Sequence, residues 1–164
     1  MSKKNIIKFD TTTDSTKWEI TDDVVMGGKS AGQFYINNNG YGVFKGTVSL
    51  ENNGGFSSLR HRFKKLKTSG YNKIILRVKG DGKTYQMRLK TDIDDRHAYS
   101  ASFKTTEVWE NIELQLNKLQ PIFRGKTLDL PNFNNEPISQ ITFLIANKKK
   151  EDFILKIDSI NLIQ

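Results

Sequence analysis

The chain has 164 residues, of which 36% are hydrophobic and 27% are charged, and it contains no cysteine. This composition is typical of one soluble globular domain, and it excludes disulfides, thiol catalysis and cysteine-ligated zinc. The net charge of +8 favours an anionic partner, but the lysines are spread along the whole chain, so nucleic acid ranks last among the candidate partners. No stretch has the form of a signal peptide or the length of a membrane span, so we expect a cytoplasmic protein.

Short runs in which apolar and polar residues alternate recur along the chain. A period of two places the apolar side chains of a strand on one face, as Ile112, Leu114 and Leu116 illustrate. The predicted strands cover residues 6–9, 17–20, 33–36, 41–50, 56–63, 72–80, 83–91, 99–105, 109–116, 138–146 and 153–163.

Turn-forming residues separate these strands. The glycine–aspartate–glycine sequence at 80–82 predicts a hairpin between the strands at 72–80 and 83–91. The longest irregular segment, 121–137, holds all three prolines. About ten strands with almost no helix predict an antiparallel sandwich or barrel. With no linker or repeat in the sequence, we expect one domain over residues 1–164.

The segment DDVVMGGKSAG, from Asp22 to Gly32, matches parts of two catalytic motifs. A phosphate-binding loop needs a first glycine where this chain has Asp23, and a helix where this chain has a strand pattern. The match to G-x-S-x-G, centred on Ser30, also lacks the helix that presents the serine of a hydrolase. We therefore expect no catalytic residue, with a hydrolase that uses Ser30 as the low-ranking alternative.

A structural interpretation of the same segment is simpler. Gly27 and Gly28 would form a tight connection between two strands, and Asp23 and Ser30 would hydrogen-bond across it.

No metal or cofactor is predicted. His61 and His97 have no partner at metal-ligand spacing. The aspartates in 92–95 lack the glycine and distant glutamate of an EF-hand loop, although a structural calcium stays open. The basic run 60–67 would place Arg60 on a positive strand face, which is either solvated or able to meet phosphate or carboxylate.

Seven parts of the chain occur together in a recognisable order. They are TDDVVMGGKSAG (21–32), GVFKGTVSLENNGGFSSLR (42–60), VKGDGKTYQMRL (78–89), YSASFKT (99–105), Trp109, PIFRGK (121–126) and FILKIDSINLI (153–163). Taken together, they resemble the CIA30 family, named for the complex I intermediate-associated protein of 30 kDa. The resemblance extends from about Trp18 to Ile163, and it implies an all-β, antiparallel jelly-roll β-sandwich of the galactose-binding type with very little helix.

The resemblance also singles out candidate residues. We expect five of them, Asp23, Ser30, Arg60, Asp81 and Arg124, to meet on one side of the sandwich, either around a ligand or partner or as a buried polar network. The aromatic candidates for contact with a ligand are Tyr85 and Trp109, although both also fit half-buried positions in a sheet. The glycines expected to shape the loops are Gly27, Gly28, Gly54, Gly55, Gly80, Gly82 and Gly125.

The function that the resemblance implies is binding without catalysis. The leading hypothesis is a module that docks on a protein partner during complex assembly, such as an assembly intermediate of NADH:ubiquinone oxidoreductase. The alternative is a carbohydrate-binding module, since the implied fold is similar to many of them.

Overall fold

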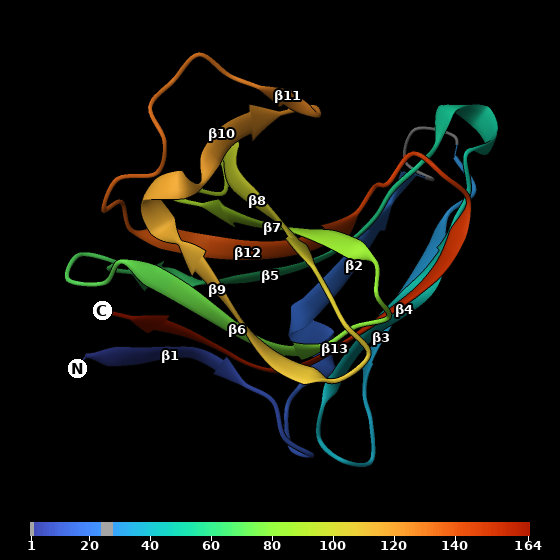
Figure 1. Cartoon of the computed structure of the whole chain (residues 1–164), viewed down its shortest axis with the longest axis horizontal. Helices are drawn as coiled ribbons and strands as arrows, with labels where there is room; N and C mark the ends of the chain where they lie inside the picture. Colours follow the sequence, from blue (N-terminus) through green and yellow to red (C-terminus); the bar gives the residue numbers. More distant parts are fainter. Residues whose placement is uncertain (1, 24–27) are drawn as a thin grey trace.

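The computed structural model, which describes residues 2–23 and 28–164, consists of two antiparallel β-sheets packed face to face (Figure 1). Sheet A has the order β3-β4-β13-β6-β9, with β1 also paired to β13, and sheet B has the order β11-β10-β8-β7-β12-β5-β2. The strands of sheet A are β1 (Lys3–Lys8), β3 (Ala31–Ile36), β4 (Gly42–Val48), β6 (Lys73–Lys79), β9 (Trp109–Gln115) and β13 (Glu151–Ile163). Those of sheet B are β2 (Trp18–Asp22), β5 (Ser57–Leu66), β7 (Thr84–Lys90), β8 (Ala98–Lys104), β10 (Gln120–Phe123), β11 (Lys126–Thr127) and β12 (Ile138–Ile145).

The alternating sequence pattern builds the core between the sheets. On β6, Ile74, Leu76 and Val78 are fully buried, while the residues between them are half-buried. The same alternation recurs on β7. Each large apolar side chain buried in this way contributes roughly 1.5–3 kcal/mol. The predicted all-β antiparallel sandwich is therefore confirmed.

Strand β13 joins three other strands within sheet A. Its first half, Glu151–Ile157, pairs with β4, and its second half, Ser159–Ile163, pairs with β1. On its other side, β13 pairs with β6 over Lys156–Ile163. Strand β13 is therefore central to sheet A (Figure 1).

The helices in the described part of the chain are single 3-10 turns. They are η1 (Ser15–Lys17), η3 (Glu51–Asn53) and η4 (Leu116–Lys118). None of them is long and apolar enough to cross a membrane.

Two details differ from the sequence-based expectation. The prediction of a hairpin at 80–82 is wrong, because β6 pairs with β9 and β13 whereas β7 pairs with β8 and β12. The chain crosses from sheet A to sheet B there, and Gly82, with φ of +83°, serves a crossover as well as a hairpin. The segment 121–137 also contains β11 and most of β10, two short strands that pair with each other.

Candidate functional site

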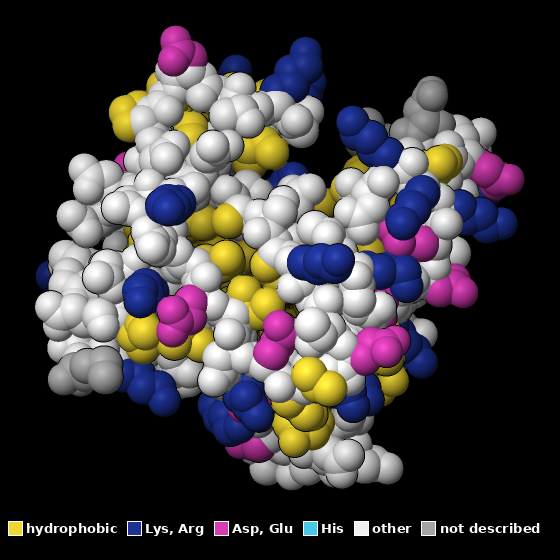
Figure 2. Space-filling view, viewed as in Figure 1, with side chains coloured by type: hydrophobic (Ala, Val, Ile, Leu, Met, Phe, Trp, Pro, Cys, Tyr) yellow, Lys and Arg dark blue, Asp and Glu magenta, His cyan; other side chains and the backbone are white. Residues whose placement is uncertain are grey.

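An open cleft of about 780 Å³ lies on the face of sheet B that points away from sheet A. Leu59, Met87 and Phe143 point into the core from β5, β7 and β12, so the residues next to them in sequence project from the opposite face. The surface is hollowed between the β10–β11 hairpin and the η3 turn (Figure 2). The cleft is lined by Thr21, Phe56, Ser58, Arg60, Arg88, Lys90, Ala98, Arg124, Gly125, Gln140, Thr142, Leu144 and Ala146.

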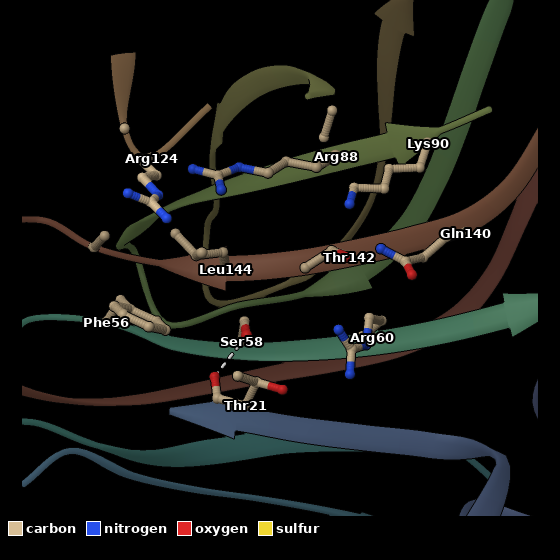
Figure 3. Close-up of a pocket in the computed structure, with 13 residues that line it drawn as sticks. Thr21, Phe56, Ser58, Arg60, Arg88, Lys90, Arg124, Gln140, Thr142 and Leu144 are labelled. Atoms are coloured by element: carbon tan, nitrogen blue, oxygen red, sulfur yellow. Dashed lines mark hydrogen bonds between the residues drawn. The ribbon is translucent and has the colours of Figure 1, made fainter. Parts of the chain in front are cut away.

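Strand register places two arginines on either side of the cleft floor. Thr142 of β12 pairs with Arg60 of β5 on one side and with Arg88 of β7 on the other. Because neighbouring strands lie about 4.8 Å apart, the Cα atoms of the two arginines are roughly 10 Å apart. Figure 3 shows both side chains, with Thr142 between their strands.

The lining carries positive charge that the protein itself neutralises only in part. Four lining residues are cations, and none is an aspartate or glutamate. Within residues 2–23 and 28–164, Arg60 is the one of these four that pairs with a carboxylate, through Nη2 and Oε2 of Glu19 at 2.8 Å. Lys90 donates to the carbonyl oxygen of Asp95 at 2.9 Å, and burial lowers the pKa of its ammonium group.

Arg88 is half-buried in this lining. Its Nη2 donates to Oε1 of Gln86 at 2.7 Å, and its Nε is buried without a hydrogen-bond partner among the described residues. Burial lowers the pKa of the guanidinium from its usual value, because a low-dielectric environment disfavours the charged form. A neutral amide does not balance this charge.

Arg124 reaches the cleft from the turn between β10 and β11. Phe123 pairs with Lys126, so Arg124 and Gly125 form a two-residue hairpin, with φ of +50° and +78°. Turns with two positive φ values favour asparagine followed by glycine, and a residue with a Cβ is disfavoured there by about 1–2 kcal/mol. An arginine is therefore held in a strained position over the cleft.

A buried carboxylate organises one end of the cleft. Asp23, which is 1% exposed, accepts hydrogen bonds from the backbone N–H groups of Ser30 at 2.9 Å, Gly55 at 2.6 Å and Phe56 at 3.2 Å. It also accepts one from the hydroxyl of Ser30. We call these residues the Asp23 network. Since Phe56 lines the cleft, the network fixes part of the cleft wall.

The pKa of Asp23 reflects two opposing effects. Burial raises it, but the hydrogen bonds from Ser30, Gly55 and Phe56 together outweigh the burial and hold the pKa below its usual value. Asp23 is thus a buried, ionised hydrogen-bond acceptor. The predicted hydrogen bonding between Asp23 and Ser30 is confirmed.

The described glycines of the candidate set occupy positions that require glycine, either because a Cβ would be too close to a neighbouring atom or because φ is positive. A Cβ at Gly54 would lie 2.5 Å from Oδ2 of Asp23, so only glycine fits against this carboxylate. Gly28 and Gly80 are also closely packed, Gly55, Gly82 and Gly125 have positive φ, and Gly27 lies outside the described residues.

The structure divides the five polar candidates among three places rather than one. Arg60 and Arg124 line the cleft, and Asp23 and Ser30 form the network at its end. Asp81 instead accepts hydrogen bonds from Tyr85 Oη at 3.0 Å and from the backbone N–H of Ile154 at 2.9 Å.

The two aromatic candidates lie outside the cleft lining. Tyr85 is 0% exposed, and burial together with Asp81 raises the pKa of its phenol. Tyr85 therefore lies in the core between the sheets, which fits its alternative interpretation as a residue of the sheet. Trp109 is half-buried on β9 of sheet A, with its ring 4.4 Å from that of Tyr41.

Ser30 is built into the structure and is not presented as a nucleophile. It is 1% exposed, and its Oγ accepts from the backbone N–H of Ser49 at 2.9 Å. In the described residues, neither histidine bonds to it, since His61 contacts the carbonyl of Lys17 and His97 the hydroxyl of Tyr99.

No metal-binding group of three or more His, Cys, Asp or Glu residues occurs in the described parts of the chain. The aspartates in 92–95 form a turn in which they hydrogen-bond to one another. The N–H of Asp92 donates to Oδ2 of Asp95 at 3.1 Å, and the N–H of Asp94 donates to Oδ1 of Asp92 at 3.0 Å.

Sequence reasoning missed most of the cleft lining, including four polar residues of β7 and β12: Arg88, Lys90, Gln140 and Thr142. They occupy the polar positions of alternating strand sequences. That pattern alone does not distinguish a binding face from a solvated one.

Several solved structures share the fold of this chain. The family 11 carbohydrate-binding module from Clostridium thermocellum, in complex with a β-1,3-1,4-mixed-linked tetrasaccharide, matches with a TM-score of 0.71 and 18% identity over 98% of this chain and 95% of that chain. An exo-β-agarase matches with a TM-score of 0.58 and 11% identity over 97% of this chain and 24% of that chain. The chain thus has the galactose-binding-like β-sandwich of carbohydrate-binding modules.

The family of the chain follows from its sequence. The model for the complex I intermediate-associated protein 30 family, CIA30, matches residues 7–157, so the chain belongs to that family. Mitochondrial proteins of this name from Mus musculus and Drosophila melanogaster are 24% and 26% identical, over 91% and 89% of this chain. The chain spans 52% and 58% of the length of these two relatives.

Proposed function

We propose that this chain is a non-catalytic binding module that holds a carbohydrate chain in the cleft of sheet B. The observation that carries the proposal is the cleft itself, an open hollow of about 780 Å³ lined by side chains from five strands and the β10–β11 turn. A site of this size on a rigid sheet suits a preformed ligand-binding surface.

The lining has the mixed chemistry that a sugar ring requires. Phe56, Leu144 and Ala98 offer apolar contact, while Arg60 and Gln140 offer hydrogen-bond donors. A sugar presents apolar C–H groups and polar hydroxyl groups, so it matches both kinds of lining. The complex of the family 11 module with a tetrasaccharide supports the same ligand class for this chain.

Filling the cleft is expected to abolish carbohydrate binding. Thr142 lies on the cleft floor between Arg60 and Arg88, so the indole of a Thr142→Trp variant would occupy ligand space. The measurement is a glycan array, followed by titration calorimetry on each oligosaccharide that binds the wild-type chain.

Gln33→Trp provides the matched control, because Gln33 is an exposed residue on β3 of sheet A. It should bind as the wild type does, and thermal unfolding should show that both variants fold. Oligosaccharide binding that survives Thr142→Trp would place the site elsewhere, and an array without any bound glycan would refute carbohydrate binding.

A second function, docking on a protein partner during complex assembly, is supported by membership of the CIA30 family. Affinity purification from the native source should then recover a defined set of respiratory-complex proteins with the wild-type chain. Recovery that is lost with Thr142→Trp and kept with Gln33→Trp would assign that docking to the cleft. Repeated purification without any specific protein would count against this function.

A further inference from the structure

We infer that the cleft selects acidic oligosaccharides, in which sugar carboxylates pair with the guanidinium groups of Arg88 and Arg124. This inference rests on the proposed carbohydrate-binding function and adds the chemical class of the ligand. It starts from the charge of the lining, which contains four cations and no acidic residue.

Arg88 supplies the first half of the argument. Its half-buried guanidinium has one hydrogen bond to a neutral amide and a buried Nε without a partner among the described residues. A desolvated cation is stable when an anion satisfies its charge and its remaining donors. No described carboxylate pairs with Arg88, so a carboxylate on a bound ligand would supply the charge and the acceptor atoms that the protein itself does not.

Arg124 supplies an independent observation. It occupies a turn position with positive φ that favours asparagine or glycine, and it lines the same cleft as Arg88. Strain of this kind is retained where the side chain has a use. Figure 3 shows the Arg88 side chain lying along β7, with its guanidinium toward the Arg124 end of the cleft.

Two guanidinium groups at one end favour a planar anion. Each guanidinium presents N–H donors in a fork that matches the two oxygens of a carboxylate. At the other side of the floor, Arg60 has a buried Nε without a partner in the described residues, although Glu19 offsets its charge. An oligosaccharide that carries carboxylates on successive sugars would contact the arginines on both sides of the cleft floor.

The position of the cleft favours a sugar over an acidic peptide. It lies over the central strands β5, β12 and β7, whose backbone groups already pair with one another. A peptide therefore has no free strand edge in the cleft floor with which to extend the sheet. Recognition has to come from side chains, which suits an oligosaccharide.

The test is titration calorimetry with tetragalacturonic acid, compared with the neutral mixed-linked β-glucan tetrasaccharide. We expect the acidic probe to bind the wild-type chain more tightly, with an affinity that falls as salt is added. Arg88→Gln should weaken binding of the acidic probe by about 30-fold or more. Arg88→Lys should restore only part of the loss, because it keeps the charge but not the fork.

Two further variants keep the result interpretable. Arg124→Ala changes an exposed turn residue, so it tests the same end of the cleft without disturbing the sheet. Arg77→Gln is the control, because Arg77 lies on β6 of sheet A with its guanidinium 6.0 Å from the ring of Trp109. It should leave binding of the acidic probe unchanged.

The outcomes separate this inference from the proposed function. Equal or tighter binding of the neutral tetrasaccharide would overturn the acidic preference and leave carbohydrate binding intact. Tighter binding of a glutamate octapeptide, sensitive to Arg88→Gln, would replace the sugar with an acidic peptide. Failure of both saccharides and the peptide to bind would overturn the inference, while any other glycan bound on the array would leave the proposed function standing.

Discussion

Replacing Asp23 with alanine is expected to lower the free energy of unfolding by about 3 to 5 kcal/mol. The reason is that the backbone N–H groups of Ser30, Gly55 and Phe56 would lose their acceptor within the protein. Each buried donor left without a partner costs about 1–3 kcal/mol. Urea denaturation at neutral pH measures the change.

The same variant, Asp23→Ala, should also weaken ligand binding, since Asp23 holds the backbone of Phe56 at the cleft wall.

Glu51→Gln is the matched control for the stability measurement, because Glu51 is an exposed acid in the adjacent turn. It should leave stability nearly unchanged. A loss of less than about 1 kcal/mol for Asp23→Ala would show that water or rearrangement satisfies these donors.

The stabilisation by Asp23 also predicts a pH dependence. The pKa of Asp23 is lower in the folded chain than the usual value, so its ionised form favours folding. The contribution is complete above the unfolded pKa of about 3.9 and is lost as the pH falls through the lower, folded pKa. The stability gap between wild type and Asp23→Asn should therefore be constant near neutral pH and narrow in strong acid.

Replacing Gly46 with valine should destabilise the fold by about 3 kcal/mol. Gly46 on β4 pairs with Gly32 on β3, and a Cβ at Gly46 would lie 2.7 Å from the Cα of Gly32 and would overlap the carbonyl of Ala31. Backbone atoms cannot rotate away, so β3 would have to move from β4. Denaturation together with amide exchange of the β3 residues would measure this.

Gly70→Ala is the comparison for this variant. A Cβ at Gly70 would have no described atom within 4 Å, but the residue has φ of +89°, so only backbone strain of about 1 kcal/mol is expected. The displacement of β3 in the Gly46 variant should also weaken the hydrogen bond of 2.9 Å from the Gly32 N–H to Oδ2 of Asp22. Equal stability losses at Gly46 and Gly70 would contradict the close approach of the two strands.

The sequence was sufficient to predict where most strands lie, but it was not sufficient to predict which strands pair. Alternation identified most of them because it reports burial on one face, as on β6 and β7. The hairpin predicted at 80–82 was wrong because glycine and aspartate occur equally well in a hairpin turn and in a crossover between sheets. The short β10 and β11 were hidden in a proline-containing segment without alternation.

The candidate site could be predicted only in part from the sequence, because it too depends on how the strands pair. Asp23 and Ser30 were found because they lie only seven positions apart in one glycine-containing segment of the sequence. Arg60 and Arg88 face one cleft only because β12 lies between their strands. That adjacency depends on sheet order, which local sequence does not encode.

The central position of β13 has a consequence for how the protein folds. This strand pairs with β1, β4 and β6, so sheet A cannot be completed until residues 151–163 are available. Contacts between such distant segments carry a large loop-closure entropy, which slows folding of β-sandwiches. During synthesis on the ribosome, β1, β4 and β6 would each emerge with an edge that stays unpaired until β13 is made, and unpaired strand edges are prone to association.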